Sequence, residues 1–361
     1  MRVINILMLK KLWFTFVHFS ARNFELHHQK NNNQSTVLVF FTYFYCLKNK
    51  DIMFIENAFA KNNFFWKYLV GSLIVIMATF AGQLPLAFAI GIKAIQDKKD
   101  FKSFTQQQMM TYLDKNLNLF LMLFSFLVGL FALFFVIKKL HNQTILQVTT
   151  ARKKIDWQRV FFSFTIWAVF SIVSVYIAFV QTPENFVYNF KPLPFLILFL
   201  IAIVLIPIQT SLEEYLFRGY LMQGFGILAK NKLFPLVMTS VIFGSLHLMN
   251  PEVDKLGYIM LVYYIGTGLM LGIMTLMDDG MELALGFHAA NNLTGCLLLT
   301  SDWSALQTNS ILRDIAEPSA GFDVVLPILI VYPILLFIFS KKYGWNNWKE
   351  KLSGSINFIK A

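Results

Sequence analysis

The sequence predicts an all-α protein, a polytopic bundle of about eight transmembrane helices. Its 361 residues are 57% hydrophobic and only 14% charged, which is too apolar a balance for a soluble protein of this length. The apolar residues form long runs and do not alternate with polar ones, so the spans are expected to be helices and not strands of a barrel. A few acidic, basic and histidine residues stand inside these runs, where a charge at the bilayer centre costs roughly 2.5 to 3.5 kcal/mol.

The apolar runs place the candidate spans in order along the chain, at residues 64–92, 117–137, 161–180, 195–228, 233–250, 257–277, 282–300 and 324–340. The run 195–228 is longer than a bilayer needs, and we expect a kink within it. An even number of spans puts both ends of the chain on one side of the membrane. Lysine and arginine gather in the loop 138–159 and in the tail 341–351, which predicts that these segments and both termini are cytoplasmic. The acidic loop 301–323 is then expected outside.

The sequence divides into four segments. Residues 1–52 form an N-terminal extension with a polar tract and interrupted apolar runs, and a clean first span follows Met53. We therefore expect the natural start at Met53, with the upstream residues poorly ordered or not part of the natural protein. Residues 53–192 hold N-terminal transmembrane helices and residues 193–300 the candidate catalytic core. Residues 301–361 comprise an outer loop, the last transmembrane helix and a basic tail.

Composition excludes two classes of function. The net charge of +11 arises from short basic loops between apolar spans, with no basic domain, so orientation in the membrane explains it and no nucleic acid partner is expected. The chain has only two cysteines, Cys46 and Cys296, which cannot build a disulfide framework or a cysteine-rich metal site.

The ionisable residues of the most apolar half are the candidates for function. Glu214 and Arg218 stand four residues apart on a predicted helix, with the acid first, which favours an ion pair along that helix. Glu213 is rotated by about 100° from Glu214 and has no cation nearby in the sequence, so a distant residue is expected to contact it. The two histidines of this half, His247 and His288, are the candidates for that contact.

An amide completes the candidate site. Asn292 follows His288 by four residues and shares its helical face, whereas Asn291 falls on a different face and is not a candidate. In one set of roles, Glu213 takes a proton from a water that His247 orients, while His288 and Asn292 donate hydrogen bonds to the oxyanion of a scissile carbonyl. Glu213, His247 and His288 could instead bind a divalent metal such as zinc, with an open position for water. The sequence does not separate these two chemistries, although the helical zinc motif His-Glu-x-x-His is absent.

The region from Phe195 to Thr300 resembles the CPBP intramembrane protease family, which includes the type II CAAX prenyl endopeptidases and the Abi or bacteriocin-processing relatives. That family carries Glu-Glu-x-x-x-Arg, then Phe-x-x-x-His, then His-x-x-x-Asn, all within transmembrane helices. This chain matches those positions with Glu213, Glu214, Arg218, Phe243, His247, His288 and Asn292.

The resemblance implies a multi-pass endopeptidase, expected in a bacterial inner membrane, that cuts a membrane-associated protein or peptide. Glu213 and His247 would activate water, His288 and Asn292 would form the oxyanion site, and Glu214 with Arg218 would be supporting or secondary catalytic residues. The cofactor stays open, either a divalent metal or none. Two other functions are compatible with the same residues: a non-catalytic immunity or scaffold protein, and a proton-coupled transporter.

The expected spans place the two histidines at different depths. His247 lies near the outer end of its span and His288 near the inner start of another that runs the same way, a difference of about 13 Å at 1.5 Å per residue. The two side chains must converge for catalysis. We therefore expect either shifted helix boundaries or a broken helix that lowers one motif.

Overall fold

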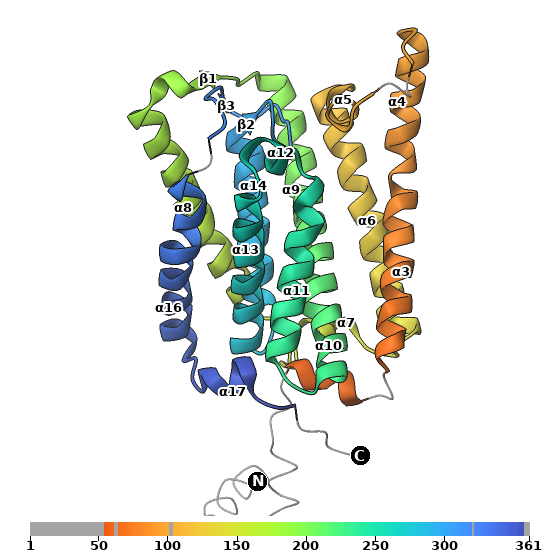
Figure 1. The fold of residues 1–361 in the computed structure, drawn as a ribbon, viewed down its shortest axis with the longest axis vertical. Coiled ribbons are helices and arrows are strands. Elements are labelled where there is room, and N and C mark those ends of the chain that lie inside the picture. The colour runs from red at the N-terminus through yellow and green to blue at the C-terminus, as the bar shows by residue number, and fades with distance from the viewer. Residues whose placement is uncertain (1–53, 61–63, 101–103, 320, 357–361) are drawn as a thin grey trace, which may run out of the picture. The chain divides into compact units, whose positions relative to one another are not determined.

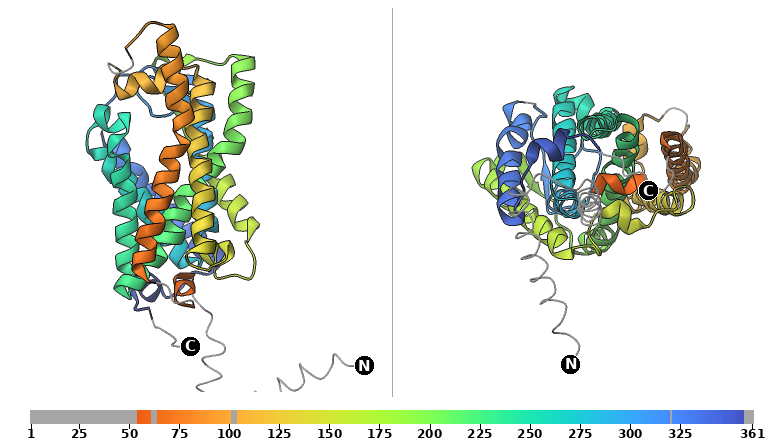
Figure 2. Two further views of the ribbon diagram at one scale, coloured as in Figure 1. Left: turned by 90° about the vertical axis from the view of Figure 1, so that its right-hand side faces the viewer. Right: turned by 90° about the horizontal axis from the view of Figure 1, so that it is seen from below.

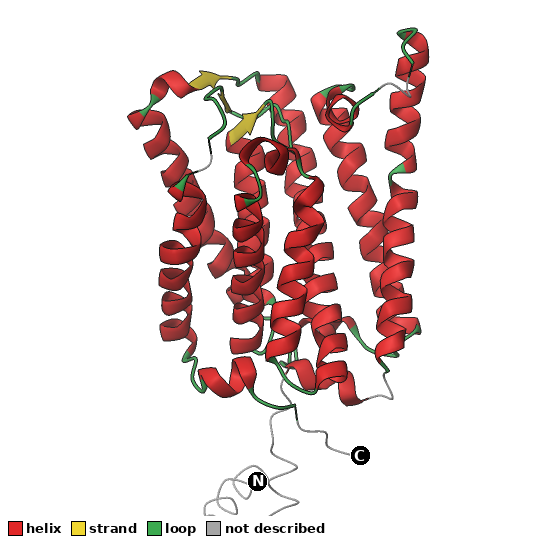
Figure 3. Ribbon diagram, viewed as in Figure 1, coloured by secondary structure: helices red, strands yellow, loops and turns green. Residues whose placement is uncertain are grey.

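The computed structural model describes residues 54–60, 64–100, 104–319 and 321–356, all within the compact unit Ile52–Ala361. The expected N-terminal extension, together with Met53, lies outside the described residues. The described chain folds as a bundle of long helices whose axes run along a common direction (Figure 1), with strands only at one end (Figure 3). The predicted all-α polytopic bundle is confirmed.

The long elements follow one another up and down the bundle. They are α3 Phe65–Gly82, α4 Leu84–Gln96, α6 Lys115–Lys139, α8 Trp157–Gln181, α9 Pro192–Glu214, η4 Tyr215–Leu221, α10 Met222–Ala229, α11 Leu233–Ser245, α13 Ile259–Met277, α14 Glu282–Leu298 and α16 Tyr332–Tyr343. Short helices lie between them, namely η1 Phe54–Ala60, α5 Gln106–Thr111, α7 Ile145–Thr149, η3 Pro183–Asn185, η5 Leu246–Met249, α12 Pro251–Leu256, α15 Phe322–Leu326, η6 Pro327–Val331 and α17 Trp348–Ser353. The α3 helix lies along α6, as the left-hand view of Figure 2 shows.

Six helical segments in the described part of the chain are long and apolar enough to cross a membrane. They are Phe65–Gln96, Lys115–Lys139, Trp157–Gln181, Pro192–Ala229, Ile259–Met277 and Val324–Tyr343. The other two expected spans, 233–250 and 282–300, correspond to α11 with 13 residues and α14 with 17 residues, both shorter than the ~20 residues of a full span. The protein is a multi-pass integral membrane protein.

The long fourth span, in which a kink was expected, changes its helix type along its length. Pro207 stands inside α9 and cannot donate a backbone hydrogen bond there. Immediately after the Glu213–Glu214 doublet, the chain continues as the π-helix η4 before α10 restores α geometry. Such π-helical turns inside α-helices are frequently found at functional sites.

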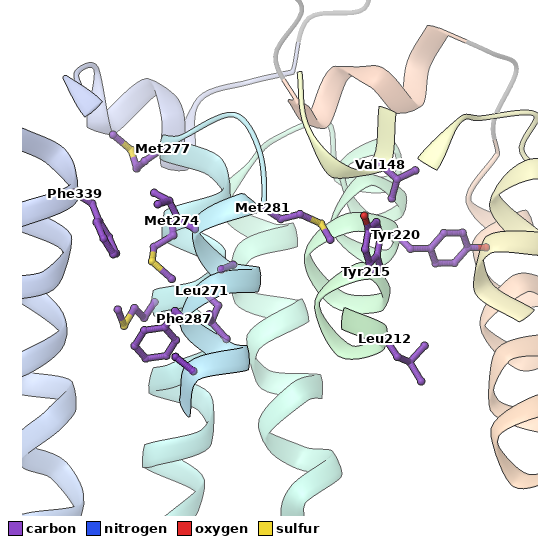
Figure 4. Packing of buried hydrophobic residues seen from close by; sticks show 14 of the residues in the cluster. Val148, Leu212, Tyr215, Tyr220, Leu271, Met274, Met277, Met281, Phe287 and Phe339 are labelled. Carbon is purple, nitrogen blue, oxygen red and sulfur yellow. The ribbon is translucent and has the colours of Figure 1, made fainter. Parts of the chain in front are cut away.

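Tight contacts hold α14 in place between its neighbours α8 and α9. A Cβ atom added at Gly286 would lie 2.1 Å from the carbonyl oxygen of Val160, so only glycine lets α14 approach α8 this closely. The hydroxyl of Ser163 on α8 donates to the carbonyl oxygen of Leu283 at 2.7 Å. Around α14 the buried core is built from aromatic and methionine side chains, among them Phe287, Met281 and Met274 (Figure 4). The face of α14 that carries His288 is therefore fixed relative to α8.

Opposite ends of the bundle hold the acidic and the basic loops. At one end a three-stranded sheet orders β1 Phe186–Tyr188, β3 Leu312–Asp314 and β2 Leu299–Ser301, with β1 antiparallel and β2 parallel to β3. At the other end the Asp278 carboxylate accepts from Arg152 at 2.7 Å, from Arg159 at 2.8 Å and from the Trp345 indole at 3.1 Å. These contacts place the loop 138–159 and the tail 341–351 together, as their shared charge predicted.

Candidate active site

The carboxylates of the acidic doublet meet the imidazole of His288. The two glutamates end α9, and His288 projects from α14. Its Nδ1 atom lies 2.7 Å from Glu214 Oε1, and its Nε2 atom lies 3.4 Å from Glu213 Oε2. The expectation that a distant histidine contacts Glu213 is therefore met by His288.

The predicted pair of Glu214 and Arg218 is present and completely buried. Arg218 Nη1 donates to Glu214 Oε1 at 3.0 Å, and Nη2 donates to the carbonyl oxygen of Gly268 on α13 at 3.3 Å. The guanidinium also lies 4.4 Å above the ring of Phe243. Among the described residues, Glu214 Oε2 and Arg218 Nε are buried without a hydrogen-bond partner. The buried part of the cluster thus keeps unused hydrogen-bonding capacity.

His247 lies at the edge of this cluster. It belongs to η5, where α11 gives way to a 3₁₀ turn. Its Nδ1 atom lies 2.8 Å from the carbonyl oxygen of Phe243, which makes Nδ1 the protonated nitrogen and leaves Nε2 to face other groups. The imidazole stacks on the ring of Tyr264 at 4.2 Å. Within the described part of the chain, His247 makes no hydrogen bond or ion pair with Glu213 or Glu214.

Phe243 lies between the two histidines, and its ring packs near both imidazoles. Its ring lies 4.8 Å from the imidazole of His247 and 6.0 Å from that of His288, measured between ring centres. After Ser245 the α11 helix gives way to the 3₁₀ turn η5, and of the two expected alternatives, shifted boundaries or a broken helix, this change corresponds to the second. The two imidazoles are thus neighbours of one aromatic ring and do not touch each other directly.

Asn292 is linked to the doublet through Gln209, a residue that the sequence motifs did not single out. Asn292 Nδ2 donates to Gln209 Oε1 at 3.0 Å, and Gln209 Nε2 donates to Glu213 Oε1 at 2.6 Å. Gln209 stands four residues before Glu213, on the same helical face, and that spacing was the signal that could have found it. Asn291, which was set aside, donates to Asn292 Oδ1 at 3.0 Å and so belongs to the same network.

The two acids of the doublet differ in exposure. The side chain of Glu214 is 0% exposed and that of Glu213 is 17% exposed, with His288 at 7%. Beside His247 stand three exposed apolar side chains, Leu246, Leu248 and Met249. The accessible part of the cluster is therefore Glu213 with His247, and its surroundings are apolar.

The candidate zinc ligands do not assemble into a metal site in this arrangement. Within the described residues, no group of three or more His, Cys, Asp or Glu side chains is placed to hold a metal ion. His288 turns both ring nitrogens toward carboxylates, and His247 Nδ1 is held by a backbone carbonyl. A catalytic zinc site needs three protein ligands around one point, and this donor set does not supply them.

Comparisons with known proteins agree with the motifs. Residues 192–294 match the model of a family described as type II CAAX prenyl endopeptidase Rce1-like. The matched segment contains every motif position from Glu213 to Asn292, and the predicted resemblance is confirmed over it. A protein of Bacillus subtilis (strain 168), named Uncharacterized protein YyaK, is 29% identical over 240 residues, which are 66% of this chain and 79% of that protein. No solved structure matches the chain.

Proposed function

Since residues 192–294 match the Rce1-like type II CAAX prenyl endopeptidases, we propose that this protein is an intramembrane endopeptidase. It would hydrolyse a peptide bond of a membrane-associated protein or peptide, of CAAX type or another. The observation that carries the proposal is the cluster of Glu213, Glu214 and His288, with contacts of 2.7 and 3.4 Å inside an apolar bundle. Ionisable groups gathered at such a place usually serve a reaction or a transport pathway.

Glu213 is proposed as the general base. It is the acid of the doublet that solvent reaches, at 17% exposure, and Gln209 holds one of its oxygens at 2.6 Å. It would remove a proton from the attacking water and later deliver it to the leaving amine. Glu214 would stay paired with Arg218 and, together with Glu213, would hold His288 in position.

His247 and Asn292 are proposed to act on the water and on the carbonyl. With Nδ1 donating to the Phe243 carbonyl, the Nε2 atom of His247 can accept a hydrogen bond from the attacking water. The Asn292 amide gives one N–H to Gln209, and its second N–H can stabilise the oxyanion, a contribution typically worth about 2.7 to 4 kcal/mol per donor. His288 was expected to share this role. Since both its nitrogens face carboxylates, we propose that it orients the doublet instead.

The surroundings of the cluster favour an apolar, membrane-bound substrate. Leu246, Leu248 and Met249 are 64%, 40% and 71% exposed beside His247, where a hydrophobic peptide segment would bury them. Orientation follows from the basic loop 138–159 and tail 341–351, which we propose are cytoplasmic in a bacterial inner membrane.

The proposal is tested by comparing membrane peptides from cells that produce the intact protein, the Glu213→Ala variant or the Glu184→Ala variant. Glu184 is an exposed acid near the end that carries the strands and serves as the matched control. A cleavage product that appears with the intact protein and with Glu184→Ala, and is absent with Glu213→Ala, is the expected result. The same product in all three samples would overturn the proposal. If the Glu213→Ala variant retains the biological activity, a non-catalytic scaffold is favoured. If the intact protein carries out proton-coupled flux into proteoliposomes and the Glu213→Ala variant does not, a transporter is favoured.

A further inference from the structure

A continuous chain of side-chain hydrogen bonds leads from α8 to the proposed general base. Trp167 Nε1 donates to Asn291 Oδ1 at 3.1 Å, and Asn291 Nδ2 donates to Asn292 Oδ1 at 3.0 Å. Asn292 Nδ2 then donates to Gln209 Oε1 at 3.0 Å, and Gln209 Nε2 donates to Glu213 Oε1 at 2.6 Å. Each amide in this chain accepts on one side and donates on the other.

The chemistry of its two ends fixes the direction of the chain. A primary amide can present either its oxygen or its nitrogen by turning over, so an amide pair alone has no preferred direction. The indole of Trp167 is only a donor, and a carboxylate in its ionised form is only an acceptor. Turning over any one of the three amides would set donor against donor and acceptor against acceptor. One orientation therefore satisfies all the bonds at once.

The donor end of the chain is held rigidly. Trp167 is 5% exposed, and its ring lies 4.9 Å from Phe170 and 4.3 Å from Phe287. The close approach of Gly286 to Val160 fixes α14 against α8 on the same side. The indole N–H cannot turn away from Asn291 without disrupting this packing.

We propose that Trp167 is a positioning residue for Glu213. Its indole N–H sets the orientation of Asn291, Asn292 and Gln209, so that Gln209 presents an N–H and not a carbonyl oxygen to the Glu213 carboxylate. The same orientation points the amide nitrogen of Asn292, and not its oxygen, toward the doublet. The effect of this hydrogen-bond direction on cleavage rests on the proposed function. The direction of the hydrogen bonds is independent of the proposed function.

The bond chain is tested without any substrate by NMR of the full-length protein in lipid nanodiscs. The seven tryptophans are labelled with ¹⁵N, and Trp167→Phe assigns the Trp167 indole resonance by its disappearance. Gln209→Leu and Glu213→Gln, which change the chain several bonds away, should each move that resonance upfield as the polarisation along the chain weakens. Trp303, whose buried Nε1 has no hydrogen-bond partner among the described residues, is the internal control and should stay in place. A Trp167 resonance that both variants leave unchanged would overturn the proposal.

The consequence for catalysis is tested by enzyme kinetics. The substrate is the membrane peptide that the intact protein cleaves and the Glu213→Ala variant does not. Trp167→Phe keeps the aromatic ring and removes only the N–H, so kcat should fall about tenfold while KM stays the same. Trp303→Phe should leave both constants unchanged. Adding Trp167→Phe to Gln209→Leu should cause no further loss, because Trp167 acts through Gln209.

The outcomes separate this inference from the proposed function. Additive losses in the double variant, or a rise in KM with kcat unchanged, would make Trp167 a packing residue only and overturn its positioning role. If the intact protein cleaves no membrane peptide, the proposed function fails, and the NMR comparison still decides whether the chain of bonds is ordered from Trp167.

Discussion

Removing the guanidinium of Arg218 should destabilise the bundle more than any other single change in the cluster. The Arg218→Met variant keeps a long apolar side chain but leaves the fully buried Glu214 without its ion-pair partner at 3.0 Å. Breaking a buried pair in this way typically costs about 3 to 5 kcal/mol, because the remaining charge stays desolvated. The contact of the guanidinium with the ring of Phe243 at 4.4 Å is lost as well. His288, which still touches Glu214 at 2.7 Å, offsets part of the loss, so we expect the lower end of that range.

Two matched variants, a double change at Arg218 and Glu214 and a surface change at Arg313, test the Arg218 prediction. Thermal unfolding in detergent should show a fall in Tm of about 4 °C for Arg218→Met. The double change Arg218→Met with Glu214→Gln removes both charges and should recover most of that loss. Arg313→Met breaks an ion pair with Asp302 in which the side chains are 38% and 66% exposed, and it should cost less than about 1 kcal/mol. If the double variant were as unstable as the sum of its single changes, the coupling between Glu214 and Arg218 would be refuted.

Three further predictions concern the scaffold around the site. Gly286→Ala places a Cβ 2.1 Å from the carbonyl oxygen of Val160. The variant should lower the free energy of unfolding by about 1 to 3 kcal/mol in chemical denaturation. An unchanged stability would contradict the close approach of α8 and α14. Burial lowers the pKa of His141 from 6.5 to about 4, so the folded state keeps it neutral. Stability should therefore be complete above pH 6.5 and fall as the pH drops from 6.5 toward 4, and His141→Gln should flatten that slope. Asp278→Asn weakens the acceptor of the Trp345 indole, so the C-terminal tail should be cut faster in limited proteolysis, with Asp302→Asn as an unaffected control.

The sequence was sufficient for contacts that follow from helical periodicity. A spacing of four residues predicted the pair of Glu214 and Arg218, which is found at 3.0 Å. The change of face between adjacent residues predicted that Glu213 needs a distant partner, and His288 provides it at 3.4 Å. Apolar runs predicted the helical bundle, because lipid leaves backbone groups no other partner.

Other features of the site required the fold. From the sequence either imidazole could contact Glu213, but in the fold His288 contacts the carboxylates while His247 packs against Phe243 and Tyr264. Asn291 was set aside because it faces away from His288, yet adjacent side chains on a helix can bond sideways, as Asn291 does with Asn292 at 3.0 Å. The two shorter spans, α11 and α14, end where the chain turns into η5 and β2.

The two acids of the doublet have the same chemistry and opposite environments, and this difference supports the roles proposed for them. Glu214 is 0% exposed, accepts from Arg218 and lies 2.7 Å from His288, so its carboxylate is immobilised and out of reach of an incoming water. Glu213 is held on one oxygen by Gln209 while its other oxygen lies 3.4 Å from His288, and it retains 17% exposure. Proton transfer requires a carboxylate that is both oriented and accessible. Of these two acids only Glu213 meets both conditions, whereas Glu214 is paired with Arg218 in the buried part of the cluster.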